Sequence, residues 1–320
     1  MNLRNQQHKK QMRYGATLAL EGASCPHEQL ARLLEQMHQA GFNTVNFYGL
    51  EQIPAQWGEV FRELARLNMQ AVVRIEEYGP DFSFSRQDIP LILERYRALL
   101  DFVCLPQHRG QVAYFALNMP VDDGAVTARL GGVNTPLSRE RQKEYASAFV
   151  SAVRMETHRR GFQSARLYLS VFYGWDGTYH VPGYAEAGAD GYFVNNYSYP
   201  AADGQAPALP CPDEALINQP RLQRAVERFQ EQYPGMPLVV EFGFHTLEYN
   251  GGRWPSQTAG LVKDRAAKRR AIEATLRYYE TVPEYEGFLY FGYNLYKEEG
   301  DPPAVMDWTL VYPEKQEEER

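Results

Sequence analysis

The chain has 320 residues, of which 44% are apolar and 13% aromatic, and its formal net charge is -7. The apolar fraction supports a large buried core. The acidic balance argues against nucleic acid as a partner, because a phosphate-binding surface needs an excess of Lys and Arg. No apolar stretch reaches the roughly 18 residues of a membrane-spanning helix, so we expect no membrane span.

Short apolar runs alternate with amphipathic stretches along the chain, and this alternation predicts parallel strands joined by crossover helices. The eight predicted strands are Tyr14–Leu20, Thr44–Tyr48, Gln70–Ile75, Val112–Leu117, Arg166–Phe172, Gly191–Asn195, Leu238–Phe242 and Gly287–Phe291. The predicted helices are His27–Ala40, Ala55–Asn68, Asp88–Cys104, Ser138–Arg160, Gln219–Tyr233 and Lys263–Val282. The fifth crossover, around Tyr184–Gly188, is short, and the last helix is reduced or missing.

The number of βα units indicates a closed barrel. The chain has no GxGxxG after its first predicted strand and no GxxxxGK[ST] run, which disfavours a doubly wound nucleotide-binding sheet. We predict an α/β fold, a single-domain (β/α)8 TIM barrel over residues 14–313, with a flexible segment 1–13 before it and an acidic tail 314–320 after it. Segment 1–13 is polar and basic rather than an intact signal peptide, so the localisation stays open: cytoplasmic, or exported with a leader removed.

The sequence favours neither a metal site nor a cofactor. Its three cysteines, Cys25, Cys104 and Cys211, lie far apart and form no CxxC pair, so a zinc site or a redox pair is not indicated. There is no HExxH and no pair of histidines at ligand spacing. A GxSxG nucleophile turn is also absent. We therefore expect no metal and no cofactor.

Glu241 is the sharpest candidate for a site residue. Active sites of barrels collect at the C-terminal ends of the strands, and Glu241 follows the apolar run Leu238, Val239 and Val240 at such an end. Burying a carboxylate there is costly unless it is paired, so its position suggests a function. The alternative interpretation is a glutamate that pairs with an arginine on the barrel rim.

Polar and aromatic side chains that follow the other predicted strands are the remaining candidates. An aromatic ring packs on the apolar face of a sugar, while a hydroxyl or an indole N–H reaches a polar group, so these residues suggest a carbohydrate. The candidate substrate-binding residues are Asn118, Tyr48, Glu76, Tyr173, Trp175, Tyr197, Tyr199, His245 and Trp308. For Glu76 the alternative is an ion pair with Arg74 or another arginine. For the tryptophans it is burial under a loop, and for the tyrosines it is packing on the barrel rim and on helix faces.

The run Glu241-Phe242-Gly243 resembles the end of strand seven in the retaining glycoside hydrolases built on (β/α)8 barrels, the glucanase and cellulase-like clan. This resemblance implies that Glu241 is a nucleophile, that Tyr197 or Tyr199 hydrogen-bonds it, and that Asn118 binds the sugar beside the cleaved bond. It also implies an oligosaccharide or polysaccharide as the partner. The stretch from Phe291 to Leu310 is similar to the closing segment of β-glucanase-like members.

One position departs from the clan, which carries Asn-Glu-Pro after strand four. Here the run is Asn118-Met119-Pro120, and a thioether cannot donate a proton to a leaving oxygen. Double-displacement hydrolysis uses two carboxyl groups about 5–5.5 Å apart. Asp122 or Asp123 could supply the acid from a nearby loop, or the leaving group could need no acid, or hydrolysis has been lost while sugar binding is kept.

Two functions follow from these alternatives. The first is a glycoside hydrolase or transglycosylase acting on a β-linked glucan or related polysaccharide, with Glu241 as nucleophile and Asp122 or Asp123 as acid/base. The second is a catalytically impaired barrel that binds carbohydrate, as an accessory to polysaccharide synthesis or export. A more distant option is an aldolase or isomerase that uses Lys297. The sequence leaves the sugar and the linkage open.

Overall fold

The structure of the protein is a computed structural model. It describes residues 12–20, 27–76, 85–117, 127–130, 133–136, 139–172, 187–195, 227, 231, 234–246, 261–262 and 264–293.

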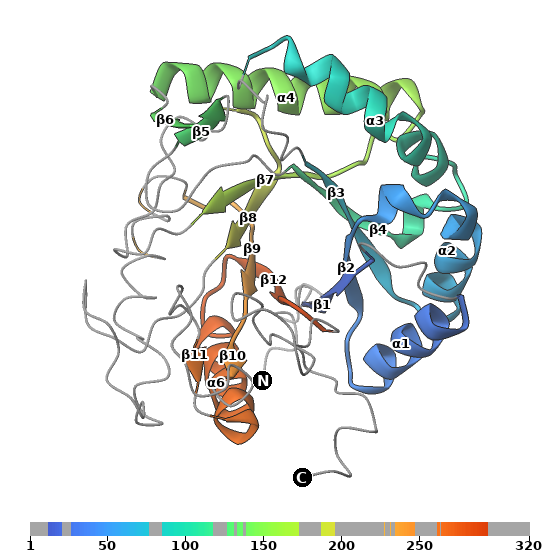
Figure 1. Ribbon diagram of the computed structural model, residues 1–320, viewed down its shortest axis with the longest axis vertical. Coiled ribbons are helices and arrows are strands. Elements are labelled where there is room, and N and C mark those ends of the chain that lie inside the picture. The colour runs from blue at the N-terminus through green and yellow to red at the C-terminus, as the bar shows by residue number, and fades with distance from the viewer. Residues whose placement is uncertain are drawn as a thin grey trace, which may run out of the picture.

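Eight parallel strands close into a barrel, in the order β1-β12-β9-β8-β7-β4-β3-β2 (Figure 1). The strands are β1 (Arg13–Ala19), β2 (Thr44–Tyr48), β3 (Gln70–Ile75), β4 (Val112–Leu117), β7 (Leu167–Phe172), β8 (Gly191–Asn195), β9 (Leu238–Phe242) and β12 (Tyr285–Tyr290). The predicted (β/α)8 barrel is therefore confirmed, because each predicted strand overlaps one strand of the ring.

Helices lie outside the ring of strands (Figure 1). They are α1 (His27–Gln39), α2 (Trp57–Arg66), α3 (Asp88–Val103), α4 (Arg139–Arg159) and α6 (Arg265–Tyr279), with short 3-10 turns at Leu50–Gln52, Pro54–Gln56 and Arg109–Gln111. Of the predicted helix Gln219–Tyr233, only residues 227 and 231 are described, and both are helical. Within the described ranges, no helix combines the length and the apolar character needed to cross a bilayer.

Several predicted elements begin one or two residues away from their predicted start, and two of these differences have a local cause. The second helix was predicted from Ala55, but a 3-10 turn occupies Pro54–Gln56 and α2 begins only at Trp57. The last strand was predicted from Gly287, but it begins at Tyr285. The register between β12 and β9 shifts between Tyr285 and Gly287, and Glu286 lies in that irregularity. In a sequence, a charged residue next to an apolar run usually belongs to a loop. For this reason the strand was predicted to begin after Glu286.

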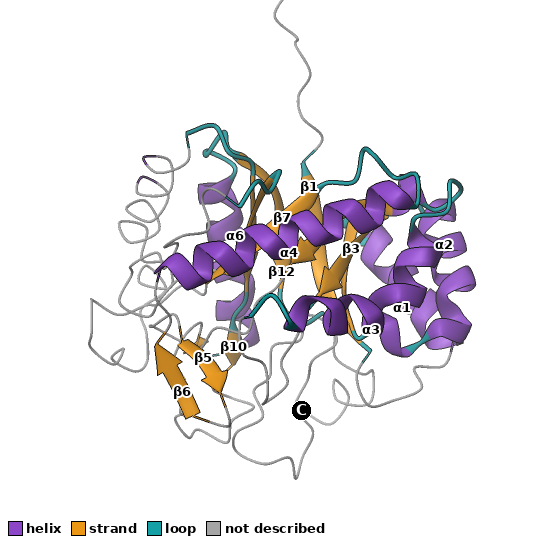
Figure 2. Ribbon diagram, turned by 90° about the horizontal axis from the view of Figure 1, so that it is seen from above, coloured by secondary structure: helices purple, strands orange, loops and turns teal. Residues whose placement is uncertain are grey.

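The sequence also missed two small sheets. Strands β5 (Thr127–Leu130) and β6 (Val133–Pro136) form an antiparallel pair. The two-residue strands β10 (His245–Thr246) and β11 (Leu261–Val262) pair in parallel. In Figure 2 the β5–β6 pair and β10 lie at the end of the barrel toward which β3 points. Both additions therefore lie at the C-terminal end of the barrel, where barrel enzymes carry their sites.

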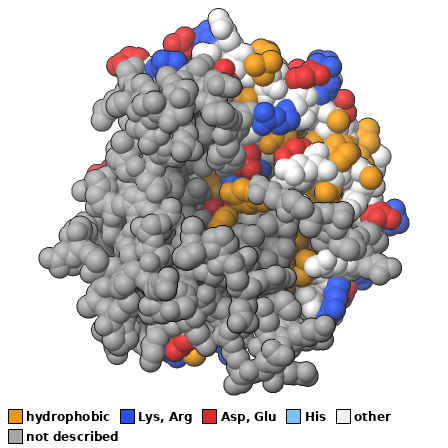
Figure 3. All heavy atoms as spheres, viewed as in Figure 1, with side chains coloured by type: hydrophobic (Ala, Val, Ile, Leu, Met, Phe, Trp, Pro, Cys, Tyr) orange, Lys and Arg blue, Asp and Glu red, His pale blue; other side chains and the backbone are white. Residues whose placement is uncertain are grey.

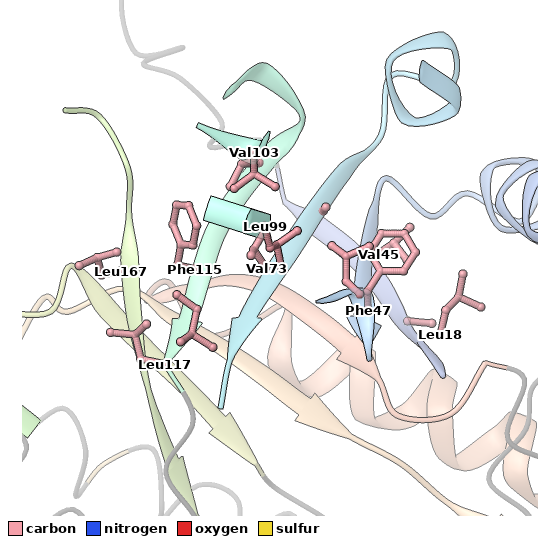
Figure 4. Close-up of a cluster of buried hydrophobic side chains, with 14 of the residues drawn as sticks. Leu18, Val45, Phe47, Val73, Leu99, Val103, Phe115, Leu117 and Leu167 are labelled. Carbon is pink, nitrogen blue, oxygen red and sulfur yellow. The ribbon is translucent and has the colours of Figure 1, made fainter. Parts of the chain in front are cut away.

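The main core lies between the strands and the helices. Leu18, Val45, Val73, Phe115 and Leu167 come from five different strands, and all are fully buried. Figure 4 shows these side chains on the outer face of the strands, with Leu99 and Val103 of α3 packed among them. A strand that is buried on both faces consists almost entirely of apolar residues, so it forms a nearly continuous apolar run in the sequence. The bounds of these strands could therefore be predicted to within about two residues.

A second cluster fills the interior of the barrel. It contains Val72, Ala113, Tyr114, Ala116, Tyr168, Phe193, Val239 and Leu289. The rings of Tyr114 and Tyr168 lie 4.5 Å apart, centroid to centroid. The ring of Tyr168 occupies the space that a side chain at position 191 would need, because a Cβ on Gly191 would lie 2.4 Å from that ring.

A charged cluster closes the N-terminal end of the interior. Glu286 is 2% exposed. Its Oε2 accepts a hydrogen bond from the Tyr168 hydroxyl at 2.6 Å, and it lies 2.8 Å from Arg166 and 3.6 Å from Arg13. Burial and this bond raise the pKa of Tyr168, so the phenol stays protonated and keeps donating. We call Arg13, Arg166, Tyr168 and Glu286 the floor cluster.

The position of Gly191 yields a test of how tightly the interior is packed. Gly191→Ala should destabilise the fold by about 1–3 kcal/mol, because the new methyl group would collide with the Tyr168 ring and the Pro237 carbonyl oxygen. Gly58→Ala is the matched control: Gly58 lies in α2 with nothing near its Cβ position, so alanine there should stabilise by up to about 1 kcal/mol. Urea unfolding measures both, and equal effects of the two variants would contradict the packing described here.

Candidate functional site

Glu241 lies at the C-terminal end of β9 and is 1% exposed. Its register partners are Asn195 of β8 and Leu289 of β12. Side chains alternate along a strand, and Val239, two residues earlier, belongs to the interior cluster. Glu241 therefore points into the barrel, just above the apolar interior.

Three donors from three other strands converge on Oε2 of Glu241. Asn46 Nδ2 of β2 donates at 3.1 Å, Thr17 Oγ1 of β1 at 3.4 Å, and Arg74 Nη1 of β3 at 3.4 Å. Asn46 Nδ2 also donates to Thr17 Oγ1 at 2.9 Å, which fixes the relative positions of the two donors. Hydrogen bonds and a positive charge of this kind favour the ionised form of a carboxyl group.

Arg74 connects Glu241 to the other carboxylate of this region. Its Nε donates to Glu76 Oε2 at 2.9 Å, and its Nη2 donates to the Tyr48 hydroxyl at 2.9 Å. The guanidinium carbon also lies 4.0 Å from the centroid of the Tyr48 ring and 5.8 Å from that of Phe193. Because Arg74 is only 4% exposed, these contacts take the place of its hydration.

We call this set the mouth cluster: Thr17, Asn46, Tyr48, Arg74, Glu76 and Glu241. The sequence analysis named an arginine partner as the alternative for both Glu241 and Glu76. Both carboxylates do contact an arginine, and for both that arginine is Arg74. In Figure 3, acidic and basic side chains lie next to hydrophobic ones near the centre of the face shown there.

The predicted site residues divide into two groups. The structure brings Tyr48, Glu76 and Glu241 together around Arg74. The other candidates, Asn118, Asp122, Asp123, Tyr173, Trp175, Tyr197, Tyr199 and Trp308, lie outside the described residues, as does Met119. For His245 the backbone lies in β10 and the side chain is outside the description. The roles assigned to this second group stay predictions.

Sequence reasoning missed Thr17, Asn46 and Arg74 as partners of Glu241. A signal for all three was present, because each is a polar residue within an otherwise apolar strand. Residues two apart on a strand lie on the same face. Thr17, Asn46 and Arg74 each follow an inward-facing residue of their own strand by two positions; these residues are Gly15, Thr44 and Val72. Polar residues at inward positions near the C-terminal ends of strands one to three would have identified this half of the site.

Tyr114 lies inside the barrel between the mouth cluster and the floor cluster. It is fully buried, and among the described residues its hydroxyl has no hydrogen-bond partner. Burial raises its pKa well above the ordinary value, and the neighbouring Tyr168 and the charge of Glu241 raise it further. Tyr114 is therefore a neutral phenol near neutral pH.

The described part of the chain offers no obvious place for a metal ion. Among these residues, no group of three or more His, Cys, Asp or Glu side chains gathers in a way that could hold one. The mouth cluster has two carboxylates, but the guanidinium of Arg74 lies between them. Within the described mouth, the two carboxylates and the guanidinium are the charged groups brought together.

Solved structures with the same barrel include several glycosidases. The chain is 11% identical to a family 1 β-glucosidase from Thermotoga maritima, with a TM-score of 0.56 over 98% of this chain and 95% of that one. It is 11% identical to a broad-specificity GH5-4 endoglucanase from Clostridium longisporum, with a TM-score of 0.53 over 87% and 81%. A β-glucuronidase from Parabacteroides merdae is 10% identical, with a TM-score of 0.57, and the match covers 93% of this chain and 34% of that one.

These identities establish a shared barrel fold. At the level of sequence, no family model matches the chain, and no curated protein is similar to it.

The arrangement around Arg74 yields a test of stability. Arg74→Leu should destabilise the fold by about 3–5 kcal/mol, because two buried carboxylates would lose the positive charge between them. Arg66→Leu on α2 is the control, since Arg66 pairs with Glu35 and Glu63 on the exposed surface and should change stability very little. Chemical unfolding compares the two variants. A stable Arg74→Leu protein would mean that the mouth cluster does not need its cation.

Proposed function

We propose that this barrel is a retaining glycoside hydrolase or transglycosylase that acts on a β-linked glucan or a related polysaccharide, with Glu241 as its nucleophile. The observation that carries the proposal is the position of Glu241: a carboxylate at the C-terminal end of an inner strand, held by three donors on one oxygen. A nucleophilic carboxylate must be ionised and fixed in direction, and these contacts favour both.

The proposed reaction has two displacements. In the first, a carboxylate oxygen of Glu241 bonds to the anomeric carbon, the glycosidic C–O bond breaks, and the leaving oxygen takes a proton. In the second, water or another sugar hydroxyl attacks the same carbon, loses a proton and releases Glu241. The three donors stabilise the carboxylate before the first step and when it is released in the second. Arg74 and Asn46 are thus positioning residues in this proposal.

The proton donor is assigned to Asp122 or Asp123, because Met119 occupies the position after strand four where the resembled clan carries its acid. Tyr197 is proposed to orient Glu241, and Asn118 to bind the sugar beside the cleaved bond. The solved structures with the same barrel support a sugar as substrate, since they include a β-glucosidase and an endoglucanase.

The nucleophile assignment is tested by Glu241→Gln. The amide keeps the size of the side chain but is a very poor nucleophile, so turnover of a β-glucan should fall more than about 1,000-fold, while oligosaccharide binding survives. Glu63→Gln on the outer surface of α2 is the control and should keep full turnover. With a 2-deoxy-2-fluoro glycoside, the unmodified enzyme should gain the mass of one sugar on Glu241. A Glu241→Gln protein with full activity would disprove the assignment.

The source of the proton is tested separately, with two leaving groups. If Asp122 or Asp123 is the acid, replacing it by Asn should slow cleavage of a cello-oligosaccharide by about 10²–10⁴-fold. Cleavage of a dinitrophenyl glycoside should change little, because that leaving group needs no proton. Asp101→Asn on α3 is the control, since Asp101 pairs with Arg160 at an exposed position. Equal losses on both substrates would exclude an acid role for the residue replaced.

A second candidate function is favoured by Met119 alone. If this residue marks a lost acid, the protein binds carbohydrate without cleaving it, as an accessory to polysaccharide synthesis or export. The two functions separate in one experiment: long incubation with a β-glucan releases reducing ends from a hydrolase and none from a binding barrel, while calorimetry detects binding for both.

A further inference from the structure

A small cavity lies at the N-terminal end of the barrel, opposite the mouth cluster. Arg13 and Gln70, which line it, are the first residues of β1 and β3, and Gln111 directly precedes β4. Its volume is about 170 Å³, whereas sites for drug-sized ligands measure about 300–1,000 Å³. The cavity therefore suits a small ion rather than a sugar chain.

The side chains that line this cavity have the chemistry of an anion site. The polar ones are Arg13, Asn43, Asn68, Gln70 and Gln111, and we call the space between them the floor cavity. Among the residues described around it, Arg13 carries the only charge, and no carboxylate belongs to the lining. Guanidinium and amide N–H groups are donors, so they match a ligand whose oxygens are negatively charged.

Arg13 is a mostly buried cation whose contacts are loose. Its side chain is 19% exposed, and the distance from its Nη1 to Glu286 Oε2 is 3.6 Å, which is too long for a hydrogen bond. The same carboxylate oxygen lies closer to Arg166, at 2.8 Å, and accepts from Tyr168 at 2.6 Å. The buried Nε of Arg13 has no hydrogen-bond partner among the described residues. A guanidinium in this state gains from a ligand that accepts hydrogen bonds.

Two of the amides can also turn toward a ligand. Gln70 Nε2 donates to the Gly110 carbonyl oxygen at 3.1 Å, and Asn43 Nδ2 donates to the backbone at 2.9 Å. Within the described part of the chain, by contrast, the side chains of Gln111 and Asn68 make no hydrogen bond. Gln111 and Asn68 are therefore the donors that a bound anion can recruit without breaking a described contact.

The end of α2 lies beside the floor cavity and opposes an anion only weakly. The C-terminus of a helix carries a partial negative charge on its unpaired carbonyl groups. Here the Leu64 carbonyl oxygen accepts from Met69 N at 2.8 Å, and the Ala65 carbonyl oxygen accepts from Asn68 N at 3.2 Å. Asn68 closes this turn in the left-handed region, with φ of 53°. Two of the last carbonyl groups of α2 are therefore already hydrogen-bonded within the chain.

We propose that the floor cavity binds a small oxyanion, with Arg13 as the charged group and Gln111 and Asn68 as amide donors. Inorganic phosphate and a carboxylate share the required chemistry, because both present several negatively charged acceptor oxygens. The proposal is independent of the proposed function, since the cavity lies at the other end of the barrel from Glu241. A ligand that binds only the folded chain stabilises it by mass action, so the anion would strengthen the barrel from its N-terminal end.

The test is calorimetric titration of the protein with inorganic phosphate, and separately with acetate, at constant ionic strength. Phosphate should bind saturably, and Tm should rise with phosphate as the site fills. Gln111→Glu should weaken binding by about 10-fold or more, because its carboxylate would repel the anion inside the cavity. Arg66→Gln is the control: it changes the net charge by the same amount, but Arg66 pairs with Glu35 and Glu63 on the surface. It should bind phosphate as tightly as the unmodified protein does.

Arg13→Gln should abolish binding, and Gln111→Glu keeps the proposal testable if the loss of Arg13 unfolds the floor cluster. Saturable binding of acetate in place of phosphate would support the site and identify its ligand as a carboxylate. Saturable binding of neither anion overturns the proposal, and so does binding that Gln111→Glu leaves unchanged. A Tm that rises with phosphate without calorimetric saturation is the general stabilising effect of this salt and also overturns it.

Discussion

The described part of the site depends on one buried cation. Arg74 extends from β3 into the barrel and holds two carboxylates, Glu76 from the end of its own strand and Glu241 from β9 across the mouth. Without it, two acids would share a region of low dielectric at a cost of several kcal/mol. With it, Glu241 lies 3.4 Å from a positive charge, and its described hydrogen-bond donors all stand on strands of the barrel.

The barrel could be predicted from sequence because its strands are buried on both faces. Runs such as Val112–Leu117 and Leu238–Phe242 are nearly continuous in apolar residues and are separated by amphipathic stretches, so their bounds follow from composition. The prediction was wrong where a local feature breaks that rule. The last strand begins at Tyr285, two residues before the predicted start, and Glu286 lies at a register shift where it joins the floor cluster. No pattern in the sequence indicates that contact.

The site was harder to predict because its partners are distant in sequence. The position of Glu241 followed from a single strand, but Thr17 lies 224 residues away and Arg74 lies 167 residues away. Periodicity shows that a side chain points inward without showing which inward side chain it meets. The structure shows that Glu76 contacts Arg74, and its proposed contact with a sugar stays a prediction.

The described contacts of Glu241 all come from one side of the ring. Thr17, Asn46 and Arg74 belong to β1, β2 and β3, which are neighbours, and only β12 separates β1 from β9. Strands β4, β7 and β8 form the opposite half of the ring. Replacements on the strands of that half leave the described contacts of Glu241 in place, so the two halves of the ring can evolve independently of each other.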